Sequence, residues 1–358
     1  MYLRRSTALK YLIAAIVGAA LYCEWFIYIV QPRYWQGLEC RSYDATCTKI
    51  LFIADPQIQG ELAVPPPLSY LFNWDSDRYL KSTFSVVLRQ FKPDVLVYLG
   101  DLMDEGSIST MSQFHGYAKR LSNIFDINYP VVQIWLPGDN DIGGENEPIM
   151  RDKVIEFDNV FHQPSVITFR NISFYKVNGI THTVPKKGDA EENNFKIVVS
   201  HYPITTMLLG RKVNDEIHPN IYFCAHDHES KYVKNTKESW YGIHVQHTHK
   251  DTQPFEGDKI LEIPFDKENL YEIYVPTCSY RMGTSKIGFG AAILENNNER
   301  MRYTVFWSPT RFPYLFFYLT VLVFLTMYCL IFCAGRLFHR IPHKKPINSD
   351  KLPLLDRI

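Results

Sequence analysis

Two long apolar segments lie near the ends of the chain. Residues 11–30 are apolar except for Glu24, and residues 313–335 carry no charge. About 20 apolar residues cross the hydrocarbon core of a bilayer, so both segments predict membrane helices. A signal peptide is the alternative for the first segment, but its apolar run is long and no small-residue cleavage site follows it. Glu24 would cost up to about 3 kcal/mol at the centre of the bilayer and less near its surface.

Basic residues flank the outer side of each segment and predict its orientation. The flanking cations are Arg4, Arg5 and Lys10 before the first segment, and Arg336, Arg340, Lys344 and Lys345 after the second. The positive-inside tendency places both ends in the cytosol and the region between them in the lumen, although Arg302 and Arg311 lie on the lumenal side. We therefore expect a cytosolic N-terminus (1–10), a membrane helix (11–30), a lumenal domain (31–311), a second membrane helix (313–335) and a cytosolic tail (336–358).

Short apolar runs and helical patterns alternate between the two segments. The runs predict buried strands at 49–54, 94–99, 131–136, 196–200 and 221–225. A helix between the first two strands has Leu80, Phe84, Val87, Leu88 and Phe91 on one face. A second helix is marked by Met111, Phe114, Leu121 and Phe125. Alternating patterns at 165–178 and from about 240 to 307 predict further strands, so the whole region reads as a layered α/β domain.

Each of the five buried strands runs into residues that can bind metal. These residues are Asp55 to Gln57, Gly100-Asp101, Asp139 to Asp141, His201, and His226 to His228. An aspartate after a strand is usually a turn or cap residue, and one histidine is usually structural. Five such strand ends in one order indicate a site, because open α/β sheets bind ligands at the carboxyl ends of their strands.

Charge and cysteine usage narrow the class of protein. The chain has 38 basic and 38 acidic side chains, and this balance argues against a generic nucleic-acid binder. No cysteines have metal-thiolate spacing, and Cys224, within an apolar strand, is expected to be a buried free thiol. Cys40 and Cys47 predict a short-loop disulfide in an oxidising lumen. Asn171-Ile-Ser173 is an acceptor for N-glycosylation, which agrees with a lumenal domain.

The order of these motifs resembles the calcineurin-like metallophosphoesterase family, with the pattern D-x-H, G-D, G-N-H-D/E, H and G-H-x-H. The resemblance covers about residues 49–295 and implies a layered α/β/β/α sandwich. It is closest to the membrane-bound metallophosphoesterase 1 branch, which includes the enzyme that remodels glycosylphosphatidylinositol (GPI) anchors and its fungal relatives. The features shared with that branch are the two flanking spans, Asp55-Pro-Gln57, the block from Gly138 to Gly143, and the segment from Val275 to Arg281.

The resemblance implies a site for two divalent metal ions. Asp55 and His228 would bind the first ion, Asp101 would bridge both, and Asp139, His201 and His226 would bind the second. Oxygen and imidazole ligands suit Mn²⁺, Fe²⁺ or Zn²⁺. Two such ions activate a water molecule and hold a phosphoryl oxygen during in-line attack.

Three residues depart from the family pattern. Gln57 stands where the family has a histidine ligand; its harder amide oxygen would favour Mn²⁺ or Mg²⁺ over Zn²⁺, so we expect Mn²⁺. Asp139 replaces a neutral asparagine and brings the site, with two divalent ions and one hydroxide, close to neutral. Asn140 replaces the histidine that helps the leaving group to depart, and an amide supplies no proton. General acid catalysis is typically worth about 10²–10⁴-fold, so another donor, a larger contribution from the metals, or a weak enzyme is implied.

Several further residues are candidates for supporting roles. Other proton donors are His182, His244, His247 and His249, for which a polar surface position is the alternative. Asp141 is expected to orient a ligand or a neighbouring loop. Tyr280 and Arg281 are candidates for contacts with the substrate phosphate or its sugar, and an ordinary salt-bridged arginine is the alternative for Arg281.

The resemblance implies a lumenal phosphodiesterase that cleaves an ethanolamine-phosphate side branch from a GPI-anchor mannose. Such an enzyme would promote transport of GPI-anchored proteins from the endoplasmic reticulum to the Golgi. Its partners would be GPI-anchored proteins or glycolipid, the membrane, and cargo-sorting machinery, without nucleic acid. The alternative is a metal-binding trafficking or cargo factor of the same fold with weak catalysis. An exonuclease of the same superfamily is disfavoured by the predicted lumenal location and the neutral charge.

Overall fold

The chain divides into two compact units. A computed structural model describes residues 5–41, 46–186, 193–236, 252–265, 268–295 and 297–340. One unit comprises residues 20–311, and the other comprises residues 1–19 and 312–358. The unit of residues 20–311 contains every strand among the described residues and is called the domain below.

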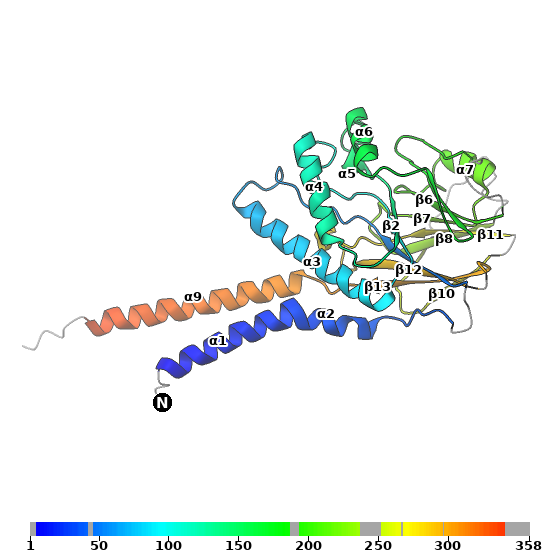
Figure 1. Cartoon of the computed structure of the whole chain (residues 1–358). Coiled ribbons are helices and arrows are strands. Elements are labelled where there is room, and N and C mark those ends of the chain that lie inside the picture. Colours follow the sequence, from blue (N-terminus) through cyan, green and yellow to red (C-terminus); the bar gives the residue numbers. More distant parts are fainter. Residues whose placement is uncertain are drawn as a thin grey trace, which may run out of the picture. The chain divides into compact units, whose positions relative to one another are not determined.

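Two sheets form the middle of the domain (Figure 1). The first sheet has the order β10-β13-β12-β1-β2-β3, with strands β1 (Thr48–Ile53), β2 (Val95–Tyr98), β3 (Val132–Trp135), β10 (Leu261–Pro264), β12 (Gly288–Glu295) and β13 (Arg300–Trp307). The second has the order β4-β5-β6-β7-β11-β8-β9, with strands β4 (Val166–Phe169), β5 (Ile172–Lys176), β6 (Phe195–Val199), β7 (Ile221–Cys224), β8 (Lys231–Thr236), β9 (Thr252–Pro254) and β11 (Asn269–Tyr274). Strands β1, β2 and β3 are parallel, as are β5, β6 and β7, so their carboxyl ends share an edge in each sheet.

The main core lies between the sheets, where the rings of Phe52 and Phe223 stack with centroids 4.0 Å apart. Helices α3 (Leu68–Phe91) and α4 (Met111–Ile124) pack beside each other, and Phe84 of α3 contacts Phe289 of the first sheet. Helix α7 (Leu209–Ile217) packs on the second sheet, where Val213 and Ile217 join a separate buried cluster with Tyr222. The short helices α5 (Asp139–Ile142) and α6 (Arg151–Val160) complete the layers. This arrangement confirms the expected α/β/β/α sandwich.

The sequence predicted the strands β1, β2, β3, β6 and β7 to within one residue at each end. Four of them lie inside the sheets, and β3 is an edge strand. All five side chains expected on the buried face of the first helix are buried in α3, but α3 begins at Leu68, well before Leu80. Met111 is an exception to the expected buried face of the second helix, because it starts α4 and is 47% exposed. Thr110 caps that helix through a capping box with Gln113.

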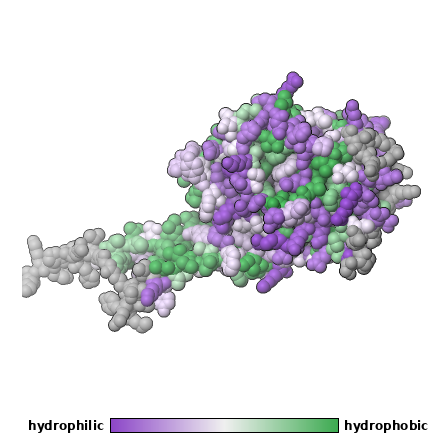
Figure 2. All heavy atoms as spheres, viewed as in Figure 1, coloured by the Kyte–Doolittle hydropathy of each residue, from purple (hydrophilic) through white to green (hydrophobic). Residues whose placement is uncertain are grey.

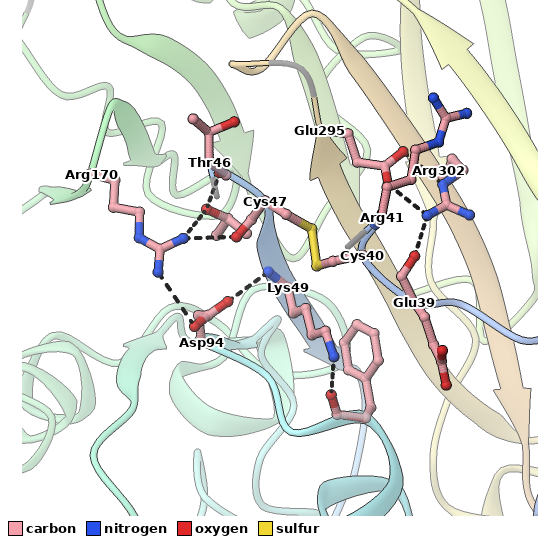
Figure 3. Close-up of a disulfide and its surroundings, with 12 residues drawn as sticks. Glu39, Cys40, Arg41, Thr46, Cys47, Lys49, Asp94, Arg170, Glu295 and Arg302 are labelled. Atoms are coloured by element: carbon pink, nitrogen blue, oxygen red, sulfur yellow. Dashed lines mark hydrogen bonds and ion pairs between the residues drawn. A yellow bond between two sulfur atoms is a disulfide. The ribbon is translucent and has the colours of Figure 1, made fainter. Parts of the chain in front are cut away.

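A disulfide joins Cys40 to Cys47, which confirms the sequence-based expectation (Figure 3). Arg170 donates a hydrogen bond to the carbonyl of Cys47 and lies 3.9 Å from Asp94. Arg302 pairs with the buried Glu295 and also bonds the carbonyl of Glu39. The backbone beside the bridge is therefore held on one side by Arg170, in the turn between β4 and β5 of the second sheet, and on the other by Arg302 of the first sheet. Cys224 is a buried free thiol, as expected.

Two segments are long and apolar enough to cross a membrane, Lys10–Tyr34 and Phe312–Gly335. They include the two segments predicted from the sequence. The second lies in helix α9 (Phe312–Arg340), and the first begins in helix α1 (Arg5–Leu21). Figure 2 shows mostly hydrophobic residues along these helices and a mostly hydrophilic surface on the domain.

Glu24 has charged partners within the domain. It lies in a π-helical turn η1 (Tyr22–Phe26), which is followed by α2 (Ile27–Val30) and the 3₁₀ turn η2 (Gln31–Tyr34). Its carboxylate accepts a hydrogen bond of 3.0 Å from Arg311 and pairs with Arg78 of α3. Arg311 is 2% exposed and also pairs with Asp75. The acidic residue in the predicted span and the basic residue Arg311 thus neutralise each other.

Candidate metal centre

The five predicted strand ends lie together at the carboxyl edges of the two sheets. Asp55 follows β1, Asp101 follows β2, Asp139 starts α5 after β3, His201 follows β6, and His226 and His228 follow β7. Positive φ angles gather here: of eleven non-glycine residues with positive φ in the described chain, five are Asp55, Gln57, Asp101, His226 and His228. Such backbone strain costs about 1–3 kcal/mol per residue and is typical of functional sites.

Two overlapping groups of side chains have the geometry of metal ligands. Asp139, His201 and His226 form one group, and Asp55, Asp101 and His201 form the other, with ligand atoms within 4.8 Å of one another in each. Nε2 of His201 lies 3.0 Å from Oδ1 of Asp139, and Nδ1 of His226 lies 3.3 Å from the same oxygen. Nε2 of His228 lies 3.8 Å from Oδ1 of Asp55.

Asp55 provides the test of whether these residues fit a cation. Its side chain is 0% exposed, and neither carboxylate oxygen has a hydrogen-bond partner among the described residues. A buried carboxylate without a donor is costly, because it loses its hydration and gains nothing in return. Two further buried carboxylates, Asp101 and Asp139, lie in the same site. A divalent cation offsets both the lost hydration and the mutual repulsion, so the donor set fits metal ions.

The electrostatics of the site give the same picture. Burial, followed by the neighbouring carboxylates, raises the pKa of Asp55 well above its usual value despite the opposing effect of His201. Burial alone would lower the pKa of His201, but Asp101, Asp139 and Asp55 together raise it to about 10. The three neighbouring carboxylates thus favour the protonated, positively charged form of His201.

Close packing of two loops requires glycine beside the metal ligands. A Cβ atom at Gly138 would lie 2.1 Å from Oδ1 and 2.3 Å from the backbone nitrogen of Asp101. Gly100 has a φ of +95°, and a Cβ atom there would lie 2.8 Å from the backbone nitrogen of Gly138. Glycine at both positions lets the loops after β2 and β3 approach closely enough to bring Asp101 and Asp139 together.

Asp141 holds these two loops in place. Its fully buried carboxylate accepts backbone hydrogen bonds from Gly138 at 2.8 Å, Met103 at 2.9 Å and Leu102 at 3.1 Å. Burial, with a contribution from Asp101, raises the pKa of Asp141 to about 7. The residue therefore joins the two loops that carry Asp101 and Asp139; its role in function remains a prediction.

The segment from Val275 to Arg281 braces the loop that carries Asp55. Thr277 donates a hydrogen bond of 2.8 Å to the carbonyl of Asp55, and the amide of Cys278 donates one of 3.0 Å to the carbonyl of Ala54. Arg281 donates to the carbonyl of Gln57 at 2.7 Å and pairs with Asp104 at 2.8 Å. The geometry of Arg281 is that of the salt-bridged alternative; a contact with substrate remains a prediction.

Gln57 and Asn140 both point at Asp101. The side-chain amide of Gln57 donates to Oδ2 of Asp101 at 2.8 Å and lies 3.5 Å from Nε2 of His228. If the side-chain amide of Gln57 is rotated by about 180°, its oxygen points toward Asp101 and His228 instead of its nitrogen, as a metal ligand requires. Asn140 donates to Oδ1 of Asp101 from its backbone and to Oδ2 from its side chain, at 3.0 and 2.7 Å. Both departures from the family pattern thus lie at the centre of the site.

Other predicted residues lie elsewhere. The hydroxyl of Tyr280 donates to Asp75 at 2.8 Å and its ring packs on Tyr79, so this side chain is directed at α3. His182 is exposed and borders a cavity with Met207 and Leu208. The other proposed proton donors, His244, His247 and His249, lie outside the described residues.

Two residues of the site were not predicted from the sequence. The ring of Tyr202 packs edge-on against His226 with centroids 4.4 Å apart. A carboxylate oxygen of Glu145 lies 4.0 Å from Nε2 of His226. Tyr202 directly follows His201, and Glu145 follows the pair Gly143-Gly144, so proximity to a ligand motif was the available signal.

Comparison with known proteins identifies the class. Residues 48–230 match the calcineurin-like phosphoesterase family, and the chain belongs to that family. The family supports phosphoester hydrolysis as the type of reaction.

Among curated proteins, the chain resembles Metallophosphoesterase 1. It is 27% identical over 208 residues to the protein of Pongo abelii, covering 55% of this chain and 51% of that protein. It is 26% identical over 130 residues to the Metallophosphoesterase 1 homolog of Drosophila melanogaster, covering 36% of this chain and 34% of that protein. The chain thus spans about half or less of the length of these relatives. Among solved structures, a metallophosphoesterase from Sphaerobacter thermophilus is 12% identical with a TM-score of 0.36, covering 74% of this chain and 90% of that one.

Proposed function

We propose that the chain is a membrane-bound, metal-dependent phosphodiesterase of the secretory pathway. The observation that carries the proposal is the buried Asp55 carboxylate, which lacks a hydrogen-bond donor and faces histidines of the same site. Two divalent ions, with Mn²⁺ favoured by Gln57, would be held by Asp55, Gln57 and His228 on one side and by Asp139, His201 and His226 on the other, with Asp101 between them. Such ions activate a water molecule and neutralise the charge of the phosphate.

The proposed substrate is the ethanolamine-phosphate side branch on a GPI-anchor mannose, and its removal would promote transport from the endoplasmic reticulum to the Golgi. The likeness to the metallophosphoesterase 1 branch supports this substrate. A cavity of about 760 Å³ beside His228 has room for a sugar, and Trp307 in its lining offers a flat apolar face. Its two lysines are paired with carboxylates, Lys231 with Glu229 and Lys286 with Glu256.

We propose that the domain lies in the lumen and that both termini lie in the cytosol. The Cys40–Cys47 disulfide supports an oxidising compartment. Asn171 is exposed in the turn between β4 and β5, where a glycan has room. GPI-anchored proteins or glycolipid and the cargo-sorting machinery are the proposed partners, with the membrane itself.

The alternative is a trafficking factor with the same fold, a bound metal and weak catalysis. Asn140 favours it, because its amide occupies the place of a histidine and is bonded to Asp101. An amide gives no proton to a sugar or ethanolamine leaving group.

The decisive experiment measures hydrolysis of a soluble phosphodiester by the full chain in detergent, loaded separately with Mn²⁺ and Zn²⁺. Asp101→Asn should lower the rate by at least about two orders of magnitude, because the carboxylate placed between the two ligand groups is lost. Asp126→Asn is the matched control, since Asp126 is exposed and outside the site; its rate should equal that of the unaltered chain.

Metal-dependent turnover that Asp101→Asn removes would support the phosphodiesterase and justify assays with anchor glycolipids. Stoichiometric metal binding without turnover on either substrate would favour the trafficking factor. Full activity in Asp101→Asn would contradict the two-metal arrangement. Asn140→His tests whether the lack of a proton donor at this position limits the reaction. A faster rate in this variant means that protonation of the leaving group is limiting in the unaltered chain.

A further inference from the structure

The first two turns of α3 expose large apolar side chains on the domain. Leu68, Tyr70, Leu71, Phe72 and Trp74 are between 45% and 63% exposed, and we call these five residues the α3 surface. No residue from 62 to 74 is charged, and Leu62 in the preceding loop is also 52% exposed. Contiguous apolar surface of this kind marks a site of contact with a protein or a membrane.

Contacts within the domain place part of the candidate span Lys10–Tyr34 beside α3. The 3₁₀ turn η2, at the end of this span, contacts α3. Further into the span, Tyr28 packs on Tyr79 and Glu24 pairs with Arg78. The span therefore lies along the turn of α3 that directly follows the α3 surface.

The neighbouring part of the span exposes similar side chains. Tyr22, Trp25, Phe26 and Ile29 are all about half exposed or more, whereas Cys23, Ile27 and Tyr28 are buried against the domain. The guanidinium of Arg78, which pairs with Glu24, lies 5.2 Å from the ring centroid of Trp74. Trp74 of the α3 surface and Glu24 of the span thus contact the same guanidinium.

We propose that the α3 surface is a third membrane contact, which lies in the interfacial layer of the bilayer beside the span Lys10–Tyr34. Tryptophan and tyrosine favour this layer, because their rings are apolar and their N–H or O–H groups reach water. Leu68, Leu71 and Phe72 supply the apolar area that an interfacial helix buries. The proposal rests on Lys10–Tyr34 crossing the bilayer; it does not depend on any substrate.

This contact would fix the distance between the metal centre and the bilayer. The loop from Gln57 to α3 is held by Glu105, whose carboxylate accepts hydrogen bonds from the amides of Leu62 and Ala63. Arg120 bonds the carbonyl of Gln59 in this loop and pairs with Asp77 of α3. A rigid connection therefore runs from the lipid-facing turns to a residue of the metal centre. A substrate embedded in the same leaflet would meet the site at a set height.

The test uses the full chain in phosphatidylcholine vesicles, with a nitroxide label on one cysteine at a time. Cys329 and Cys333, the exposed free cysteines of the described chain, are first changed to serine. Leu71→Cys carries the test label. Leu208→Cys is the matched control, because Leu208 is 99% exposed on the same domain. In a separate variant only Cys333 is changed to serine, so that the label sits on Cys329. This residue lies within the candidate span Phe312–Gly335 and provides the bilayer reference.

The measurement compares relaxation of each label by oxygen, which partitions into lipid, with relaxation by a water-soluble nickel chelate. We expect an oxygen-to-nickel ratio at Leu71→Cys several-fold above that at Leu208→Cys and near that at Cys329. A ratio at Leu71→Cys equal to that at Leu208→Cys would overturn the proposal. Low accessibility to both reagents would also overturn it, because the surface would then be covered by protein, such as a second copy of the chain. An aqueous ratio at Cys329 would remove the membrane arrangement on which the proposal rests.

A second measurement needs no cysteine. Brominated lipids quench tryptophan emission at the depth of the bromine atoms, and Trp74→Phe should lower the quenched fraction of the emission. An unchanged fraction would count against the proposal. If the proposed hydrolysis is established, Leu71→Ser should slow turnover of vesicle-bound substrate and leave turnover of a soluble phosphodiester unchanged. Failure of the soluble reaction would concern the proposed function alone.

Discussion

At the scale of single residues, the candidate metal centre requires glycine at position 138, because Asp101 occupies the space that a larger side chain would need. Gly138→Ala would place a methyl group against Asp101, within 2.1 Å of its carboxylate and 2.3 Å of its backbone. Because part of the obstacle is backbone, a rotamer change alone cannot relieve it. Overpacking of this kind costs typically 1–3 kcal/mol. We expect lower stability and substoichiometric metal, measured by denaturant unfolding and elemental analysis.

Gly116→Ala is the control for that substitution. Gly116 lies within α4, and a Cβ atom there meets nothing within 4 Å. Alanine should therefore leave metal content unchanged and raise the free energy of unfolding by up to about 1 kcal/mol, since glycine is the poorer helix former. Equal metal content in both variants would show that the loops of Asp101 and Asp139 tolerate separation.

That the residues of the candidate metal centre lie together could be predicted, because each follows an apolar run and parallel strands bring such positions to one edge. The partners of Glu24 could not be predicted. Arg78 and Arg311 are distant from it in the sequence and meet it only after α3 packs on the span. The structural role of the segment from Val275 to Arg281 could not be predicted either. Its hydrogen bonds go to the backbone carbonyls of Ala54, Asp55 and Gln57, and bonds to backbone carbonyls require no particular side chains at the accepting residues.

At the scale of secondary structure, periodicity predicts the buried parts of elements and misses their exposed ends. The apolar face of α3 is regular from Leu80 to Phe91, where the helix packs on the first sheet. From Leu68 to Trp74 the apolar side chains are exposed and do not follow the spacing of a buried helix face. The start of the helix was therefore not predicted. The strands were easier, since both faces of the central ones are buried.

Strand β11 carries a pH-sensitive connection to the loop after β6. The buried Glu272 accepts hydrogen bonds from the amides of Ile204 and Thr205 and from the hydroxyl of Thr205. Burial outweighs these bonds and raises the pKa of Glu272 to about 7 from the ordinary value of 4.5. The folded chain therefore binds a proton more tightly than the unfolded chain. Its stability should fall as pH rises from about 4.5 to 7, and the loss should be complete above 7.

Glu272→Gln removes this titration while it keeps an acceptor oxygen. Relative to the unaltered chain, the variant should gain on the order of 3 kcal/mol in unfolding free energy between pH 4.5 and 7.5, from the shift of 4.5 to about 7. Denaturant unfolding at a series of pH values measures the difference. Glu216→Gln, at a half-buried position of α7 outside the Glu272 network, should run parallel to the unaltered chain. A Glu272→Gln curve that also runs parallel would contradict the assignment.

At the scale of the whole molecule, one arginine joins three distant parts of the chain. Arg311 lies directly before α9, bonds Glu24 of η1 and pairs with Asp75 of α3. Since it is buried, Arg311→Ala leaves two carboxylates facing each other without their shared cation, which costs about 3–5 kcal/mol. Arg211→Ala, at an exposed pair with Asp215, should cost less than about 1 kcal/mol.

Denaturant unfolding in detergent distinguishes an unpaired charge from lost packing. If charge is the cause, Asp75→Asn added to Arg311→Met should recover most of the stability, because neutral groups of similar volume replace the buried pair while Glu24 keeps Arg78 as its partner. Arg311→Lys should recover only part, since an ammonium group cannot form the paired contacts of a guanidinium. Equal losses in Arg311→Ala and in the double variant would mean that shape rather than charge holds the span against the rest of the domain.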